Sequence, residues 1–189
     1  ALYSAGHADL DVTKDAPRED MVRNRDRKNS FILGDSGGFQ IGKGVWEGDW
    51  KDPNCPKAQK KRELVLSWMD AYMDRGMVLD IPAWVAESPA GRKATGITSF
   101  SEAVAGTYIN NDYFMKNRNG NCKFLNVLQG QTHNDAQDWY DKMKHYCDIR
   151  NPDHFDGWSM GGQNMSDPHL VLHRLVEMRH DRLLEKGYH

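Results

Sequence analysis

The chain has 189 residues, enough for one domain with a sizeable core or for part of a larger domain. Hydrophobic residues make up 39% of it and charged residues 28%, which is typical of a soluble globular protein. No stretch approaches the roughly 18 consecutive apolar residues that a membrane span requires, so we expect a cytoplasmic protein without membrane contact. The net charge of −2 argues against a surface coated in positive charge for nucleic acid, and leaves only local basic clusters at 18–28 and 57–62.

Three cysteines are present, and they are far apart in the sequence: Cys55, Cys122 and Cys147. Their odd number and wide spacing fit neither a disulfide framework nor a Cys-x-x-Cys metal site. We therefore expect reduced structural thiols and no metal or cofactor held by this chain.

Residues 1–29 are polar and charged, and we expect a connecting segment or a loop packed over the site. Residues 30–189 then alternate between strand and helix patterns four times. Short apolar runs predict strands at 31–35, 77–82, 123–130 and 155–160. Three-to-four spacing of apolar residues predicts helices at 56–76, from Ser99 to about 117, from Asn134 or Asp135, and from Ser166 or Asp167. The segments 41–56 and 83–98, rich in glycine, alanine or proline, predict ordered loops.

Strands separated by helices of this length pair in parallel through right-handed crossovers. Two α/β architectures follow, an open doubly wound sheet and a (β/α)8 TIM barrel, and both bind ligands at the carboxyl ends of strands. Four successive strands end in polar or glycine residues, at Asp35, Asp80, Gln129 and Gly161. Such ends share one mouth in a barrel but spread along an edge in an open sheet. We therefore favour a barrel, with residues 1–189 forming about four βα units of one barrel domain.

The first of these strand ends carries the most unusual sequence, Asp35-Ser36-Gly37-Gly38-Phe39-Gln40. A buried strand delivers a carboxylate, a hydroxyl, two glycines and an aromatic ring into a loop. Asp, Ser and Gly are also ordinary turn residues, so this motif alone says little. Its weight comes from the three polar strand ends that follow it in the chain.

Together these groups suit a planar heterocycle with an amide-like edge, such as guanine. Asp80 accepts two hydrogen bonds, Gln129 both donates and accepts, and the backbone at 161–162 donates. Phe39 supplies a ring face, and Asp35 is left for acid–base work. Among the tryptophans, those near predicted strand ends are the candidates for ligand contact: Trp46 and Trp84.

These residues resemble the successive motifs of the tRNA-guanine transglycosylases (queuine tRNA-ribosyltransferases), in order and spacing, from about residue 30 onward. The motifs are Asp35-Ser36-Gly37-Gly38-Phe39-Gln40, Leu79-Asp80-Ile81-Pro82, Val127-Leu128-Gln129-Gly130 and Gly161-Gly162. The family also includes phage and bacterial relatives that insert 7-deazaguanine bases into DNA. The resemblance implies a (β/α)8 barrel with a zinc-bearing insertion, which exchanges guanine for a 7-deazaguanine through a covalent enzyme–nucleic acid intermediate.

The resemblance also implies a role for each matched residue. Asp35 would be the general acid/base, and the substrate-binding residues would be Ser36, Phe39, Asp80, Gln129, Gly161 and Gly162. Phe39 would stack on the base, Asp80 would bind its N1 and amino edge, and Gln129 with the Gly162 amide would hold the 6-carbonyl.

Some features of the family are not matched here. Its nucleophilic Asp and its cysteine-rich structural zinc site lie further along than His189, so we expect this chain alone to be inactive. The tRNA enzymes differ from this chain at Ile81-Pro82, at Gln163 after the glycine pair and in the loop with Trp46 and Trp50, which favours the DNA-modifying branch.

The expected partners are nucleic acid, either DNA or tRNA, and a guanine or 7-deazaguanine base. A homodimer and a separate partner subunit are both left open. Two other interpretations remain at this point: a non-catalytic nucleic-acid-binding subunit of a transglycosylase, and an unrelated barrel enzyme that acts on a phosphorylated metabolite.

Overall fold

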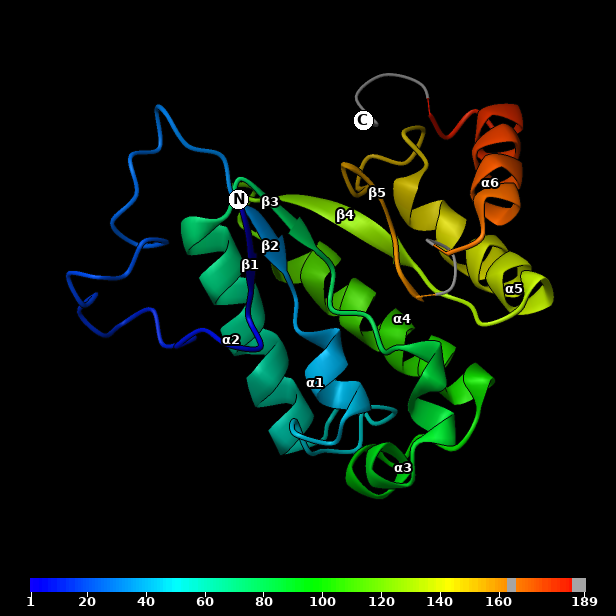
Figure 1. The fold of residues 1–189 in the computed structure, drawn as a ribbon, viewed down its shortest axis with the longest axis horizontal. Coiled ribbons are helices and arrows are strands. Elements are labelled where there is room, and N and C mark those ends of the chain that lie inside the picture. The colour runs from blue at the N-terminus through cyan, green and yellow to red at the C-terminus, as the bar shows by residue number, and fades with distance from the viewer. Residues whose placement is uncertain (163–165, 185–189) are drawn as a thin grey trace.

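The computed structural model of the chain describes residues 1–162 and 166–184. These residues form an α/β fold around a five-stranded sheet in which every neighbouring pair is parallel. The strands follow one another across the sheet in chain order (Figure 1), as β1 (Leu2–Ser4), β2 (Leu33–Asp35), β3 (Arg75–Met77), β4 (Lys123–Leu128) and β5 (Gly157–Met160). The α/β class and the parallel pairing predicted from the sequence are therefore confirmed.

The helices lie between the strands and after β5. They are α1 (Gly38–Gly42), α2 (Pro56–Tyr72), α3 (Pro89–Thr95), α4 (Phe100–Asn117), α5 (His133–Met143) and α6 (Pro168–His180), with short 3-10 turns η1 (Ala83–Glu87) and η2 (Lys144–Cys147). α2 contacts α4, and α4 contacts α5, so these helices form a continuous layer. Figure 1 shows α1 directly beyond the carboxyl end of β2, and α3 contacts it there.

One face of the sheet packs against this helical layer. Gly34 and Gly76 are partners in the β2–β3 register, and both lie against the end of α2. A Cβ atom on Gly34 would lie 2.7 Å from Met73, and one on Gly76 would lie 3.0 Å from the Met69 sulfur. The glycines thus allow α2 to approach the sheet closely, which explains Gly34 within the motif without any role for it in binding.

The opposite face of the sheet carries the side chains of the residues that alternate with Gly34 and Gly76 along the strands. Asp35 on β2, Met77 on β3, Val127 on β4 and Ser159 on β5 all line one cavity. Successive side chains of a strand point to opposite faces, so this follows from the positions of Gly34 and Gly76. The sheet therefore has one face packed on helices and one face that leads to a ligand-sized space.

The N-terminal segment differs from the expectation. The sequence predicts that residues 1–29 form a connecting segment or a loop packed over the site. In the structure, Leu2–Ser4 forms β1, which pairs with β2 and places Ser4 opposite Asp35. A strand of three residues gives no readable alternation, because period-two patterns need at least four residues. The sheet thus begins one strand earlier than the sequence indicated.

The segment before Asp80 also differs. β3 is Arg75–Met77 rather than 77–82, since α2 ends at Tyr72 and the chain is extended from Met73. Asp80 therefore follows the strand by three residues. The strand at 123–130 is confirmed in its core as β4.

The helix caps are mostly as predicted, but helical elements occur where loops were predicted. α1 extends to Gly42, at the start of the loop predicted at 41–56, and η1 and α3 lie within the loop predicted at 83–98. Ser99 and Asp167 cap α4 and α6 as predicted, whereas α5 begins earlier, behind Thr132. Across 1–162 and 166–184, none of the helices has the length and apolar character needed to cross a membrane.

Candidate functional site

A cavity of about 360 Å³ lies at the carboxyl ends of β2 to β5. Its wall includes nearly all of the side chains and glycines that the sequence singled out: Asp35, Phe39, Asp80, Gln129, Gly161 and Gly162. Residues that the sequence did not single out complete the wall, namely Gly38, Met77, Pro82, Val127, Ser159 and Met160, together with the suspected Trp84. Four strand ends that are far apart in the sequence therefore meet around one space.

Ser36 and Trp46 do not reach this wall. Ser36 is buried, and its Oγ has no hydrogen-bond partner among the described residues. Trp46 is buried where its ring packs on Gly37: a Cβ there would lie 2.6 Å from the indole. Gly37 has a φ of 83°, which favours glycine, so the turn depends on this residue for its shape. Ser36 and Trp46 thus support the loop rather than face the cavity.

Asp80 and Gln129 are hydrogen-bonded to each other across the cavity floor. The Gln129 Nε2 donates to Asp80 Oδ2 at 2.7 Å. The same carboxamide packs on the glycine pair, because a Cβ on Gly161 would lie 2.8 Å from Nε2 and one on Gly162 would lie 2.9 Å from Oε1. Side chains larger than glycine at 161–162 would therefore displace Gln129.

Burial raises the pKa of Asp80 to about 7, from an ordinary value of 3.8. The Gln129 hydrogen bond opposes this shift and the nearby Asp35 charge adds to it. Near neutral pH the Asp80 carboxyl group therefore exists in both protonation states. It can donate a hydrogen bond when protonated and accept two when ionised.

Buried contacts to α4 hold the segment that carries Asp80. Thr107 Oγ1 accepts from the Ile81 N–H at 3.0 Å, and the Asn110 side-chain amide donates to the Leu79 carbonyl at 2.7 Å. Asn110 in turn accepts from the buried guanidinium of Arg62 at 2.6 Å. These bonds take the place of strand pairing, so Asp80 is fixed although it lies beyond β3.

Gly38 lets the two acidic strand ends approach each other. A Cβ at this position would lie 2.4 Å from the Asp80 backbone oxygen. No ordinary side chain fits so close to a backbone carbonyl, so the second glycine of the pair at 37–38 is required by packing between the two loops.

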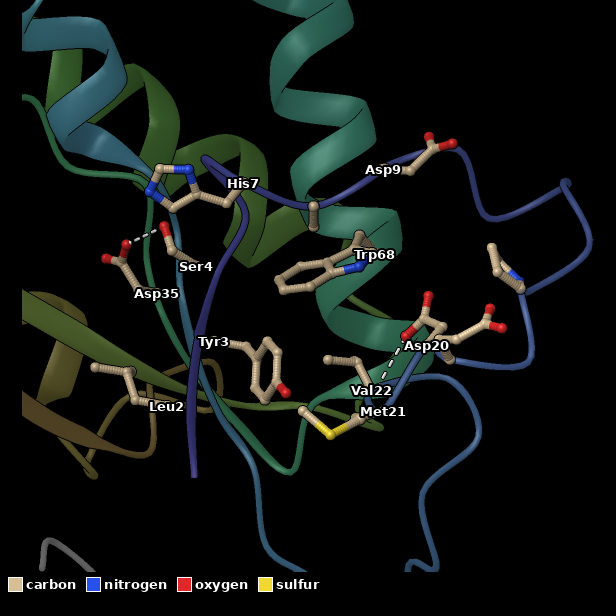
Figure 2. A pocket seen from close by; sticks show the side chains of 13 residues that line it. Leu2, Tyr3, Ser4, His7, Asp9, Asp20, Met21, Val22, Asp35 and Trp68 are labelled. Carbon is tan, nitrogen blue, oxygen red and sulfur yellow. Dashed lines mark hydrogen bonds between the residues drawn. The ribbon is translucent and has the colours of Figure 1, made fainter.

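Asp35 is held by a residue that the sequence did not single out. Ser4 Oγ donates to Asp35 Oδ2 at 2.5 Å (Figure 2). The same oxygen accepts from the Gly6 N–H at 3.1 Å. Because the Gly6 amide occupies one lone pair of Ser4, the hydroxyl proton is directed at the carboxylate. The available signal was a polar residue after Leu2-Tyr3 that is followed by Gly6, a pattern similar to that at Asp35 and Gln129.

A second and larger cavity, of about 750 Å³, opens on the other side of Asp35. Figure 2 shows Tyr3 of β1 and Trp68 of α2 in its wall, together with the chain that follows β1. Two of its other carboxylates serve local turns: Asp9 pairs with Lys14 at 3.0 Å, and Asp20 accepts from backbone amides. Asp35 thus borders both cavities, although only the smaller one gathers the strand ends.

An aromatic pair forms the rim of the smaller cavity. The rings of Phe39 and Trp84 meet edge to face with centroids 5.7 Å apart, and 56% of Phe39 is exposed. Trp84 sits over Gly42, where a Cβ would lie 2.5 Å from the indole. The ammonium of Lys43 lies over both rings, 5.4 Å from the Phe39 centroid and 5.8 Å from that of Trp84. An exposed aromatic ring flanked by an ammonium group therefore lies at the entrance.

In the ranges 1–162 and 166–184, no group of three or more His, Cys, Asp or Glu side chains is arranged to hold a metal ion. The zinc site that the resemblance implies concerns residues outside this chain and stays a prediction. Comparison of the chain with protein-family models, with curated proteins and with solved structures finds no match.

Proposed function

We propose that this protein contributes the base-binding half of a transglycosylase that exchanges guanine in a nucleic acid for a 7-deazaguanine. The observation that carries the proposal is the convergence of Asp35, Asp80, Gln129 and the 161–162 glycines on one cavity. At about 360 Å³, this cavity is at the small end of the range of about 300–1,000 Å³ for ligand sites, which suits a single base.

The polar groups of the cavity complement the edge of guanine. Asp80 faces the N1–H and amino group as an acceptor, while Gln129 and the Gly162 N–H offer donors to the 6-carbonyl. The Asp80–Gln129 bond seen in the free protein has to open or shift for this, and the base then takes over both partners. Phe39 covers the ring face with its exposed side.

The arrangement of the sheet supports the (β/α)8 barrel. The strand order follows the chain without reversal, helices pack on one face, and the other face leads to the cavity. An open doubly wound sheet reverses its strand order and carries helices on both faces. Further strands that continue the sheet beyond β1 or β5 would close the barrel around the same mouth.

Asp35 is placed for proton transfer in the exchange. When the glycosidic C–N bond breaks, its electron pair moves to the base nitrogen and a proton must reach that base. A carboxylate nucleophile forms the new bond to the sugar carbon and is displaced when the incoming base attacks. By resemblance, Asp35 handles the proton and a second Asp outside this chain is the nucleophile. The larger cavity behind Asp35 leaves space for the sugar.

The test combines exchange with base binding. We expect the full-length protein that contains both this chain and the nucleophilic Asp, supplied with radiolabelled guanine and either tRNA or duplex DNA, to label one of the two, and Asp35→Ala to abolish the label. Equilibrium binding of free guanine should be lost in Gln129→Leu and retained in Gln137→Leu, a control on α5 outside the cavity.

Three outcomes are distinguishable in this experiment. Labelling that depends on Asp35 supports the exchange. An affinity for free guanine that is the same in Gln129→Leu and the wild type would contradict the proposal. Nucleic-acid binding without any guanine binding would instead identify a non-catalytic partner subunit.

A further inference from the structure

The rim of the smaller cavity is cationic as well as aromatic on the side of α1 and α3. Lys43 follows α1 directly, and Lys93 lies in the last turn of α3. Both side chains are exposed, and within 1–162 and 166–184 no carboxylate pairs with either of them. By contrast, the nearby Lys57 is neutralised by Glu47 at 2.8 Å. One uncommitted positive charge, that of Lys43, therefore lies beside an exposed aromatic ring, and a second, that of Lys93, lies on the adjoining helix α3.

The two lysines are held close to the cavity by tight packing between α1 and α3. A Cβ on Gly44 would lie 2.9 Å from the Ala90 carbonyl oxygen, and one on Gly91 would lie 2.6 Å from the Gly42 carbonyl oxygen. Lys93 shares a shallow surface pocket with Gly44, next to Lys43 in the chain. The backbones that carry both lysines thus belong to one rigid rim rather than to independent loops.

Lys43 is oriented as well as placed. Its ammonium lies over the rings of Phe39 and Trp84, where the electrostatic attraction between a cation and an aromatic face stabilises it. Sites for single-stranded nucleic acid combine these two elements, an aromatic ring on which a base stacks and cations that follow the backbone. A base stacked on Phe39 would bring its own phosphate to the side where Lys43 stands.

We propose that the phosphodiester backbone of the substrate strand crosses the α1–α3 rim, with one phosphate at Lys43 and a neighbouring phosphate at Lys93. Trp84 supports Phe39 from behind and keeps Lys43 over the entrance. This assignment rests on the proposed function, because it takes the exchanged base to occupy the smaller cavity. It adds the side from which the strand enters.

The test measures the salt dependence of oligonucleotide binding. A fluorescein-labelled stem-loop with one guanine in its loop, in ribo and deoxy versions, is titrated by fluorescence anisotropy from 50 to 200 mM NaCl. The slope of log K against log salt concentration is negative, and loss of one phosphate contact reduces its magnitude by about 0.7 for a single strand. We expect Lys43→Gln to bind several-fold more weakly with this smaller slope, and Lys93→Gln to show a similar but weaker effect.

The matched control is Lys60→Gln, which removes an exposed charge on α2 whose nearest carboxylate, Glu63, is 3.8 Å away. It should leave both affinity and slope as in the wild type. Free guanine should bind Lys43→Gln as tightly as the wild type, because Lys43 contacts the backbone and not the base. Comparison of the ribo and deoxy stem-loops then identifies which nucleic acid the rim binds.

Several results would overturn the inference. These are an unchanged slope in both Lys43→Gln and Lys93→Gln, an equal loss in Lys60→Gln, and no oligonucleotide binding by the wild type. If guanine still binds while the slopes are unchanged, the entry side is wrong and the proposed function stands. If guanine does not bind but the salt slope depends on Lys43, the assignment of the strand to the rim is supported and the proposed exchange activity is contradicted.

Discussion

The two cavities that meet at Asp35 are built from different parts of the chain. The smaller one is formed by strand ends and by segments bonded to the buried core, such as the one that carries Asp80. The larger one is formed by β1 and the loop after it, where Arg23 bonds to the backbone carbonyls of Asp9, Asp11 and Lys14. Buried hydrogen bonds to α4 hold the wall of the smaller cavity. Hydrogen bonds within a surface loop hold the wall of the larger cavity.

The pKa values of the carboxyl groups differ between the two cavities in the same way. Burial raises the pKa of Asp80 to about 7, whereas the hydrogen bond from Lys14 lowers the pKa of Asp9. A buried acid that lacks an opposite charge is poised for a ligand, while a solvated acid with a lysine partner serves its own loop. Asp80 thus remains available for a ligand, whereas Asp9 is already paired within its own loop.

The largest effect that tests this contrast is expected for Asp80→Asn. Between pH 3.8 and about 7 the folded state keeps a proton on Asp80 that the unfolded state has lost, so this group destabilises the fold increasingly as pH rises through that window. The stability of Asp80→Asn relative to the wild type should therefore increase by roughly 3 kcal/mol from pH 5 to pH 8. Urea unfolding of both proteins at the two pH values measures it.

Asp9→Asn is the control from the larger cavity, with the opposite sign. Because the pKa of Asp9 is lowered by folding, its contribution is present above pH 3.8 and is lost on acidification. Asp9→Asn should thus match the wild type in its change between pH 5 and pH 8. A relative stability of Asp80→Asn that is the same at both pH values would contradict the contrast between the cavities.

A smaller effect is expected for Asn110→Ala, which tests whether the smaller cavity is fixed from the core. The variant loses the bond to the Leu79 carbonyl and leaves the Arg62 Nε without its acceptor. Hydrogen bonds to charged groups contribute about 1.5–3 kcal/mol, so we expect about 2 kcal/mol less stability in urea unfolding. Asn117→Ala, at the exposed end of the same helix, should change it by less than about 0.5 kcal/mol. Equal losses of stability in the two variants would mean that the bonds from Asn110 to Leu79 and Arg62 do not stabilise the fold more than an exposed side-chain bond does.

The smallest effect is expected for Ser4→Ala, at the boundary between the cavities. Removal of the hydroxyl frees Asp35 from its 2.5 Å bond, and a loss of about 1.4 kcal/mol in the positioning of Asp35 should lower kcat for exchange by the full-length protein about tenfold. Guanine binding should not change, and Ser4→Thr should restore the rate because it keeps the hydroxyl. Ser101→Ala, an exposed serine on α4, is the matched control. A rate for Ser4→Ala equal to that of Ser101→Ala would show that Ser4 does not position Asp35.

Much of the architecture could be predicted from local patterns. The β4 strand, the caps at Ser99 and Asp167, and the alternation of strand and helix all depend on residues close in sequence. The polar residue at each strand end was readable for the same reason, because carboxyl ends of parallel strands share one edge. The meeting of Asp35, Asp80 and Gln129 at one cavity was a consequence of that rule, and the structure brings them together.

The sequence by itself determined the alternation of strand and helix from β2 onward and the polar residues that gather near the strand ends, since helix periodicity, capping and apolar runs are encoded within a few residues. The strand β1 and the end of β3 at Met77 could not be predicted in this way. Only the tertiary structure decided that Ser4 holds Asp35, that Gln129 bonds Asp80, and that Asn110 anchors the segment beyond β3. Each of these contacts joins residues at least 31 positions apart. No local pattern encodes such pairs, because they arise only when separate elements pack against one another.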